Sequence, residues 1–369
     1  MKSEQRRETA SPPPPVRAGS EVHLDEWVAP ELADDQGFLR AGTILEWMDV
    51  VGVLAAARHC RCPVVTASID GMELRDPIKS GERVAMTARV AYTSAHSVGV
   101  SVTMEHDDGR GVARPTLEAY MTFVPLDRRG RSVEVPRFSP ETPLERARFR
   151  EGQLRREFRR RLQEAPVKPH VDEAELLDGD VPERDRPLLL QQWMARLPRY
   201  LRMPWERAEA QAPRARHRSY MHKIEPVRIS SLNFHGTLYG GTLMRWSETS
   251  ANLSARAYAD GAAVRCTGLH GLTFLRPVER DRFVHLRSVV VHTAGATLTS
   301  LVSVQSEDPT RGQYVENLRA FFTFAPHDSG ARVAPLECQS DEERALFDEV
   351  ERRIALQRRL LASGEARAA

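Results

Sequence analysis

A segment of this sequence occurs twice, and the two copies stay in register over most of the chain. Residues 33–49 (ADDQGFLRAGTILEWMD) align without a gap with residues 232–248 (LNFHGTLYGGTLMRWSE), at an offset of 199 residues. The regions that follow keep an offset of 200 at Pro77 and Pro277. A fold for this chain must therefore use one structural unit twice, and 369 residues give room for two cores.

Each copy has the same order of predicted elements. A polar loop broken by glycine leads into a helix, TILEWMDVVGVLAAARH (43–59) in the first copy and TLMRWSETSANLSARAY (242–258) in the second. After each helix, apolar and polar residues alternate between turn residues, which predicts antiparallel strands. We expect an α+β fold in which each antiparallel sheet wraps around its long central helix. Because the second helix carries Ser247, Ser250 and Ser254, we expect it to face a polar cleft or another subunit.

The repeat also predicts the domain boundaries. The N-terminal segment contains SPPPP and has no apolar pattern, so we expect it to be disordered. Charged helical stretches follow both copies, and we interpret them as solvated helix faces. The expected divisions are a disordered tail at 1–20, a first domain at 21–128, a charged, partly helical linker at 129–217, a second domain at 218–328 and a C-terminal helix at 329–369.

Composition and cysteine spacing exclude several classes of protein. Hydrophobic residues make up 41% of the chain, charged residues 28%, and the net charge is +2, a profile typical of soluble globular proteins. We expect no membrane span, no secretory signal and no nucleic-acid partner, and therefore a cytoplasmic protein. The cysteine spacing matches no common metal site, so we expect free thiols and no metal at Cys60, Cys62, Cys266 and Cys338.

Asp49 is the first candidate for chemistry. It lies inside the apolar run WMDVVGVLAAA, where a carboxylate is unfavourable unless it has a partner or a function. One interpretation is an aspartate that reaches solvent at a domain edge. The other is a base or nucleophile whose pKa the environment adjusts.

The loop of the second copy supplies the other candidates. Gly240 and Gly241 open the second helix, whose first N–H groups lack partners within the helix and can hold an oxyanion or a phosphate. Asn233 lies just before them, and its amide can orient a water molecule or bind a carbonyl oxygen. The alternatives are a tight turn for the glycines and a local Asx turn for Asn233.

The acid and the amide belong to different copies. If the two units pair about a pseudo-two-fold axis, one junction combines Asn233, the Gly240 helix end and Asp49. The other junction combines Asp34 with Glu248, two acids without an amide. We therefore expect one working composite site, and a second junction that is inactive or altered.

At these residues the chain resembles the acyl-CoA thioesterases that carry two hotdog domains in one chain. The resemblance covers about residues 30–330 and rests on NFHGTLYGGTLMRW, EWMDVVGVLAAARHC, VVTASIDGM with DPIKSGERV, and YTSAHSVGVSV. It is strongest to the cytoplasmic acetyl-CoA hydrolase and brown-fat-inducible branch, whose lipid-binding START domain we expect this chain to lack. In that family an aspartate on one hotdog helix and an asparagine in the partner loop form the site, which implies Asp49 and Asn233 here. Tyr239 departs from the family, where His or Phe is common, as does Ser247.

The resemblance implies hydrolysis of fatty acyl-CoA to a free acid and CoA. Asp49 would activate water or attack the carbonyl, and the N–H groups of Gly240 and Gly241 would hold the oxyanion. No cofactor or metal is expected, since CoA enters as part of the substrate, and a trimer of double-hotdog chains is implied. The alternatives are a non-catalytic sensor of acyl-CoA or nucleotide, and a hotdog hydratase, which would need a His about five residues after the Asp, where Leu54 stands.

Overall fold

The computed structural model describes residues 21–109, 113–127, 129–164, 219–328, 333–338 and 341–368. The predicted tail at 1–20 and most of the predicted linker lie outside the described residues. The first unit consists of β1 (Val22–Trp27), η1 (Pro30–Leu32), α1 (Ala41–Cys60), β2 (Val64–Leu74), β3 (Arg83–Thr93), β4 (Val98–Asp107), β5 (Arg114–Pro125) and α2 (Pro143–Glu164). The second repeats this order with β6 (Met221–Pro226), η5 (Ile229–Ser231), α6 (Gly240–Tyr258), β7 (Val264–Phe274), β8 (Phe283–Ala294), β9 (Thr297–Asp308), β10 (Gln313–Pro326) and α7 (Asp341–Ala368).

The ten strands form one antiparallel sheet in the order β1-β3-β4-β5-β2-β7-β10-β9-β8-β6. The two halves of the sheet meet where β2 pairs with β7. In that pairing Ile69 lies opposite Leu272 and Met72 opposite Leu269, so residues related by the 200-residue offset exchange partners. This crossed register is the signature of a pseudo-two-fold axis between the halves.

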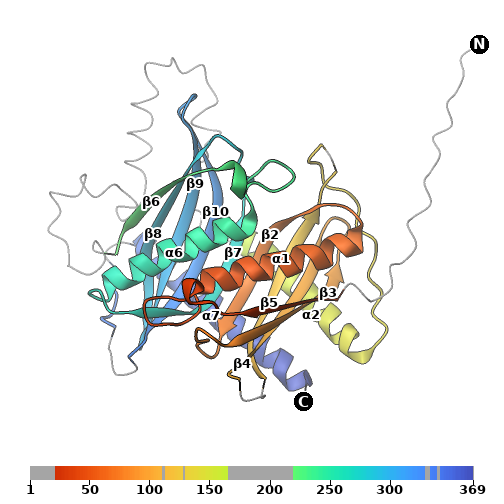
Figure 1. Cartoon of the computed structure of the whole chain (residues 1–369), viewed down its shortest axis with the longest axis horizontal. Helices are drawn as coiled ribbons and strands as arrows, with labels where there is room; N and C mark the ends of the chain where they lie inside the picture. Colours follow the sequence, from red (N-terminus) through yellow and green to blue (C-terminus); the bar gives the residue numbers. More distant parts are fainter. Residues whose placement is uncertain are drawn as a thin grey trace, which may run out of the picture.

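Helices cover both faces of the sheet. Figure 1 shows α1 and α6 across the front of the sheet, with α2 and α7 behind it. The predicted boundaries 21–128 and 218–328 enclose the strands and central helix of the two units. Among the helices that the structure describes, none is long and apolar enough to cross a membrane.

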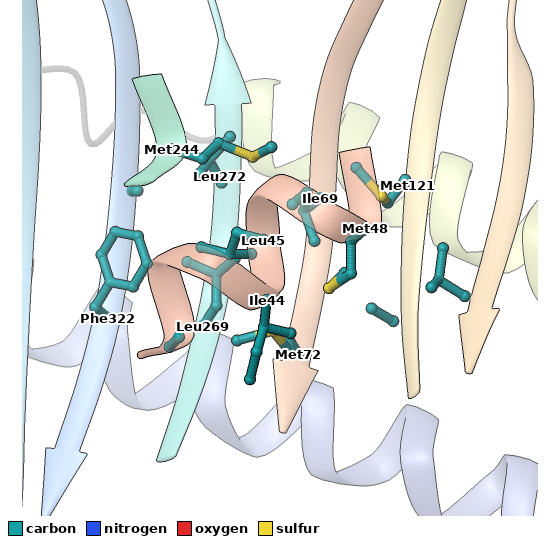
Figure 2. Packing of buried hydrophobic residues seen from close by; sticks show 14 of the residues in the cluster. Ile44, Leu45, Met48, Ile69, Met72, Met121, Met244, Leu269, Leu272 and Phe322 are labelled. Atoms are coloured by element: carbon teal, nitrogen blue, oxygen red, sulfur yellow. The ribbon is translucent and has the colours of Figure 1, made fainter. Parts of the chain in front are cut away.

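The core lies between α1 and α6 and the sheet face that they cover. Ile44, Leu45 and Met48 of α1 are each at most 1% exposed and belong to the same buried cluster as Ile69 and Met72 of β2 (Figure 2). The same cluster of buried residues continues through α6, β7 and β10, with Met244, Leu269, Leu272 and Phe322. One continuous core therefore spans both halves and holds them in a fixed orientation.

The serines of α6 contradict the expectation of a polar cleft or a subunit contact. Ser247, Ser250 and Ser254 are all fully buried. The Ser247 hydroxyl donates to the Leu243 carbonyl at 2.8 Å, and Ser250 shares a 2.9 Å hydrogen bond with Ser288 of β8. Ser247 and Ser250 are compatible with a core because nearby groups satisfy their hydroxyls. The Ser254 hydroxyl is buried without a hydrogen-bond partner among the described residues.

The N-terminal halves of α1 and α6 pack against each other at the pseudo-two-fold axis. A Cβ added at Gly42 would lie 3.1 Å from the Arg245 Cα, and one added at Gly241 would lie 3.2 Å from the Glu46 Cα. Glu46 and Arg245 are equivalent positions of the repeat, and they form an ion pair at 3.0 Å. Two identical copies would place like charges here, whereas the two different residues of this chain attract each other.

The helices that follow each unit are only partly solvated. Arg155 of α2 is 6% exposed, and Val350 of α7 is fully buried. The prediction of solvated helix faces is therefore wrong for the side that packs on the sheet. This side of the helix is buried because Val289, Val291 and Phe321 form an apolar patch on the outer face of the sheet. The α7 helix covers that patch.

Candidate active site

Asp49 is buried at the boundary between the two units. Its side chain lies on α1 and is 1% exposed. The Gly241 N–H of α6 donates to Asp49 Oδ2 at 2.9 Å, a contact between residues 192 positions apart in the chain. The structure thus brings the acid of the first copy to the helix end of the second, and Asp49 does not reach solvent.

Thr66 of β2 is a further partner that sequence reasoning missed. Its hydroxyl donates to Asp49 Oδ1 at 2.5 Å, so Thr66 and Gly241 bind different oxygens of the carboxylate. The repeat offers a signal for it, since position 66 aligns with Cys266 at the 200-residue offset. Thr66, like Asp49, is a position where the two copies carry different polar residues, and this difference could have identified it as a candidate.

Tyr239 completes the surroundings of the carboxylate. It is the N-cap residue of α6, and its hydroxyl forms a hydrogen bond with Asp49. Burial raises the pKa of the Tyr239 phenol above its usual value, and the negative charge of Asp49 adds to the rise. The phenol is therefore a stable hydrogen-bond donor to the carboxylate at neutral pH.

The pKa of Asp49 results from opposing effects. Burial raises the pKa to about 6, against 3.8 for an ordinary aspartate. The hydrogen bonds from Thr66, Gly241 and Tyr239 lower it, and the nearby charge of Glu46 raises it slightly. A carboxyl group with this pKa is mostly ionised at neutral pH, yet more basic than an exposed aspartate, as general-base catalysis requires.

Close approach explains the glycine at position 240. A Cβ there would lie 3.2 Å from Asp49 Oδ2 and 3.5 Å from Thr66 Oγ1. Any larger residue would enter the space directly beside the carboxylate. Gly240 and Gly241 are the first two residues of α6, where backbone N–H groups have no acceptor within the helix.

Asn233 has its hydrogen bonds within its own loop. Its Oδ1 accepts the N–H groups of His235 at 2.9 Å and Thr237 at 3.3 Å, and its Nδ2 donates to Thr237 Oγ1 at 3.0 Å. This is the Asx turn that the sequence allowed. The structure brings Asp49, Gly240 and Gly241 together, whereas the contacts of Asn233 are with the loop that leads into Tyr239.

The second junction has the same frame with different chemistry. Glu248 of α6 is 5% exposed and accepts a hydrogen bond from the Gly42 N–H of α1. Burial raises the pKa of Glu248 to about 7, while Arg40 and Gly42 oppose the rise and Asp34 adds to it. A cavity of about 230 Å³ lies beside this carboxyl group. The structure thus places Asp34 and Glu248 at one junction, as the repeat predicted.

No arrangement of three or more His, Cys, Asp and Glu side chains suited to a metal ion occurs in the described part of the chain. All four cysteines are free thiols, as expected.

Comparison with known proteins agrees with this geometry. A family profile described as the thioesterase superfamily matches residues 36–113 and again residues 235–313. The uncharacterized acyl-CoA thioester hydrolase YkhA of Bacillus subtilis is 35% identical over 128 residues, which are 34% of this chain and 74% of that protein. The chain belongs to the thioesterase superfamily. The double match to a superfamily domain confirms the prediction of two hotdog domains in tandem.

Longer relatives of this superfamily member match only in part. The cytosolic acyl coenzyme A thioester hydrolase of Homo sapiens is 34% identical over 148 residues, covering 39% of each chain. The acetyl-coenzyme A thioesterase of Rattus norvegicus is 27% identical over 270 residues, covering 73% of this chain and 42% of that protein. The chain thus spans about two fifths of the length of each of these mammalian relatives.

Proposed function

We propose that this chain hydrolyses acyl-CoA thioesters to a free acid and CoA at the junction that contains Asp49. The observation that supports this most directly is the Asp49 carboxylate itself. It is buried, it has a raised pKa, and it accepts the Gly241 N–H at the start of a helix from the other half of the chain. Acyl-CoA thioester hydrolases among its relatives support the same substrate class.

In the proposed reaction, Asp49 takes a proton from water while the water oxygen attacks the thioester carbon. The C–S bond then breaks, and the CoA thiolate takes the proton back. Direct attack by Asp49, followed by hydrolysis of the anhydride, is the alternative route. Both routes require Asp49 ionised and correctly oriented, which is the role we assign to Thr66 and Tyr239.

Stabilisation of the oxyanion falls to the helix end. Because the Gly241 N–H donates to Asp49, we assign the Gly240 N–H as the donor to the substrate oxygen. Loss of one such donor typically lowers kcat by about 10²–10³-fold. Asn233 would place the carbonyl or the water molecule through the second N–H of its Nδ2, since the first donates to Thr237 Oγ1.

We further propose a cytoplasmic homo-oligomer, a trimer of double-hotdog chains. Exposed apolar side chains on the outer side of the first central helix support a contact surface: Val50 and Leu54 of α1 are 38% and 42% exposed. Light scattering after size-exclusion chromatography tests the assembly, and a monomeric mass would contradict it.

The function is tested by measuring thiol release from acyl-CoAs of increasing chain length. We expect Asp49→Asn to lower kcat by at least about 10³-fold, because the variant cannot accept a proton or act as a nucleophile. Asp25→Asn, at an exposed position of β1, is the matched control and should leave the rate unchanged. Equal rates for Asp49→Asn and the wild type would exclude this site. Binding without turnover by the wild type would favour the sensor.

A further inference from the structure

The cavity at the second junction has the features of a ligand site. Its volume is about 230 Å³, and it is open to solvent on one side. One part of its wall is apolar, with Phe38, Ile44 and Leu253. Another part is charged, with the cations Arg40, Arg256 and Arg265 and the acids Asp34, Asp35, Asp76 and Glu248. A pocket with an apolar wall and a few converging polar groups suits a small amphipathic molecule.

The repeat relates three groups of this cavity to groups at the Asp49 site. Glu248 corresponds to Asp49 and Arg40 to Tyr239, both at the 199-residue offset, and Cys266 corresponds to Thr66 at the 200-residue offset. In each junction the carboxyl group accepts an N–H from the start of the other unit's helix. The second cavity therefore has the frame of a thioester site.

Two replacements work against hydrolysis there. Asp34 stands at the position of Asn233, and its Oδ1 accepts the N–H groups of Gln36 and Phe38, both at 2.9 Å. The turn is conserved in shape, but a carboxylate has no N–H to offer a substrate oxygen. Its negative charge also opposes the oxyanion that forms when a thioester carbonyl is attacked.

Arg40 offers the contact that a bound thioester would use. Its Nε donates to the Ala33 carbonyl at 3.1 Å, which fixes the guanidinium at the start of α1. The guanidinium carries further N–H donors besides Nε, and it stands close enough to Glu248 to lower the pKa of that carboxyl group. A neutral carbonyl oxygen can accept from the guanidinium, and Arg265 adds positive charge for the phosphates of CoA.

We propose that the cavity beside Glu248 is a second acyl-CoA site, which binds the thioester and does not cleave it. The proposal rests on the proposed function for its substrate class. It assigns one hydrolytic site and one retention site to each chain, so that occupied chains hold two ligand molecules at saturation.

Calorimetry with a non-hydrolysable ligand tests the number of sites. The probe is a 2-oxoalkyl-CoA, in which a methylene separates the carbonyl from the sulfur, and free CoA is the comparison ligand. We expect two molecules of the ketone per chain of the full-length protein. Free CoA should bind the second site at least about tenfold more weakly, because it lacks the carbonyl that Arg40 contacts.

Leu253→Trp is designed to fill the second cavity, which Leu253 lines from an exposed position. We expect it to remove one of the two binding events and to leave kcat/KM within about twofold of the wild type. Leu54→Trp places the same bulk at the equivalent position of α1 and leaves the second cavity open. Binding at the site beside Glu248 should therefore persist in this variant. Arg40→Gln is the milder variant and should weaken that event about tenfold, whether or not Leu253→Trp folds.

The outcomes separate this inference from the proposed function. One ketone molecule per chain of an active wild-type enzyme would overturn the second site and leave the function intact. Two molecules bound with no change in Leu253→Trp or Arg40→Gln would also overturn it. Turnover that persists in Asp49→Asn and is lost in the double variant Asp49→Asn/Glu248→Gln would show that the site beside Glu248 is catalytic. The proposal that this site only binds the thioester would then be wrong. Two sites in an inactive wild type would support the inference while refuting hydrolysis.

Discussion

Removal of the Tyr239 hydroxyl should move the acid limb of the pH–rate profile. Tyr239→Phe keeps the ring and removes one hydrogen bond to the Asp49 carboxylate. A hydrogen bond to a charged group contributes about 1.5–3 kcal/mol, and 1.36 kcal/mol corresponds to one pKa unit. Because the bond favours the ionised form, its loss raises the pKa of Asp49 from about 6 by roughly one to two units.

This shift gives a rate effect that depends on pH. With a pKa of about 6, roughly nine tenths of the wild-type carboxyl groups are ionised at pH 7. In the variant, about a tenth to a half would be ionised, so kcat/KM at pH 7 should fall about two- to tenfold. At pH 9 the variant should approach the wild-type rate. The assay measures thiol release in well-buffered solutions from pH 5 to pH 9. An equal loss of kcat/KM at every pH would refute the reasoning.

Two more predictions concern the helix end and the second acid. Gly240→Ala places a Cβ 3.2 Å from an Asp49 oxygen, so we expect kcat to fall at least about tenfold with an unchanged circular dichroism spectrum, and wild-type turnover would show that this space is not used. Burial raises the pKa of Glu248 from 4.5 to about 7, against the opposing effect of Arg40. Between these pH values the folded protein therefore binds more protons at Glu248 than the unfolded chain does. The free energy of unfolding should therefore fall as pH rises from about 4.5 to about 7, and Glu248→Gln should reduce this loss when urea midpoints are compared at pH 5 and pH 7.5; identical pH dependence in both proteins would contradict it.

The interpretation of the polar positions on the two central helices shows where sequence patterns reach their limit. Asp49 and Ser250 both interrupt apolar helical patterns, and both are buried. For Asp49 the pattern allowed a functional acid, and the structure gives it partners from β2 and from the start of α6. For Ser250 the same reasoning predicted a polar cleft or a subunit contact, but the residue faces Ser288 in the core. A pattern shows that a polar group needs a partner, while only packing decides which partner it finds.

The sequence by itself determined the repeat, the order of helices and strands, and the division of the acid and the amide between two copies. These depend on local spacing and on comparison of the chain with itself. The tertiary structure alone decided that the Gly241 N–H contacts Asp49, that Thr66 and Tyr239 hold the same carboxylate, and that Asn233 keeps its hydrogen bonds within its loop. Hydrogen bonds act over about 3 Å, and the crossed β2–β7 register and the α1–α6 contact fix positions to that precision only after the two halves fold against each other.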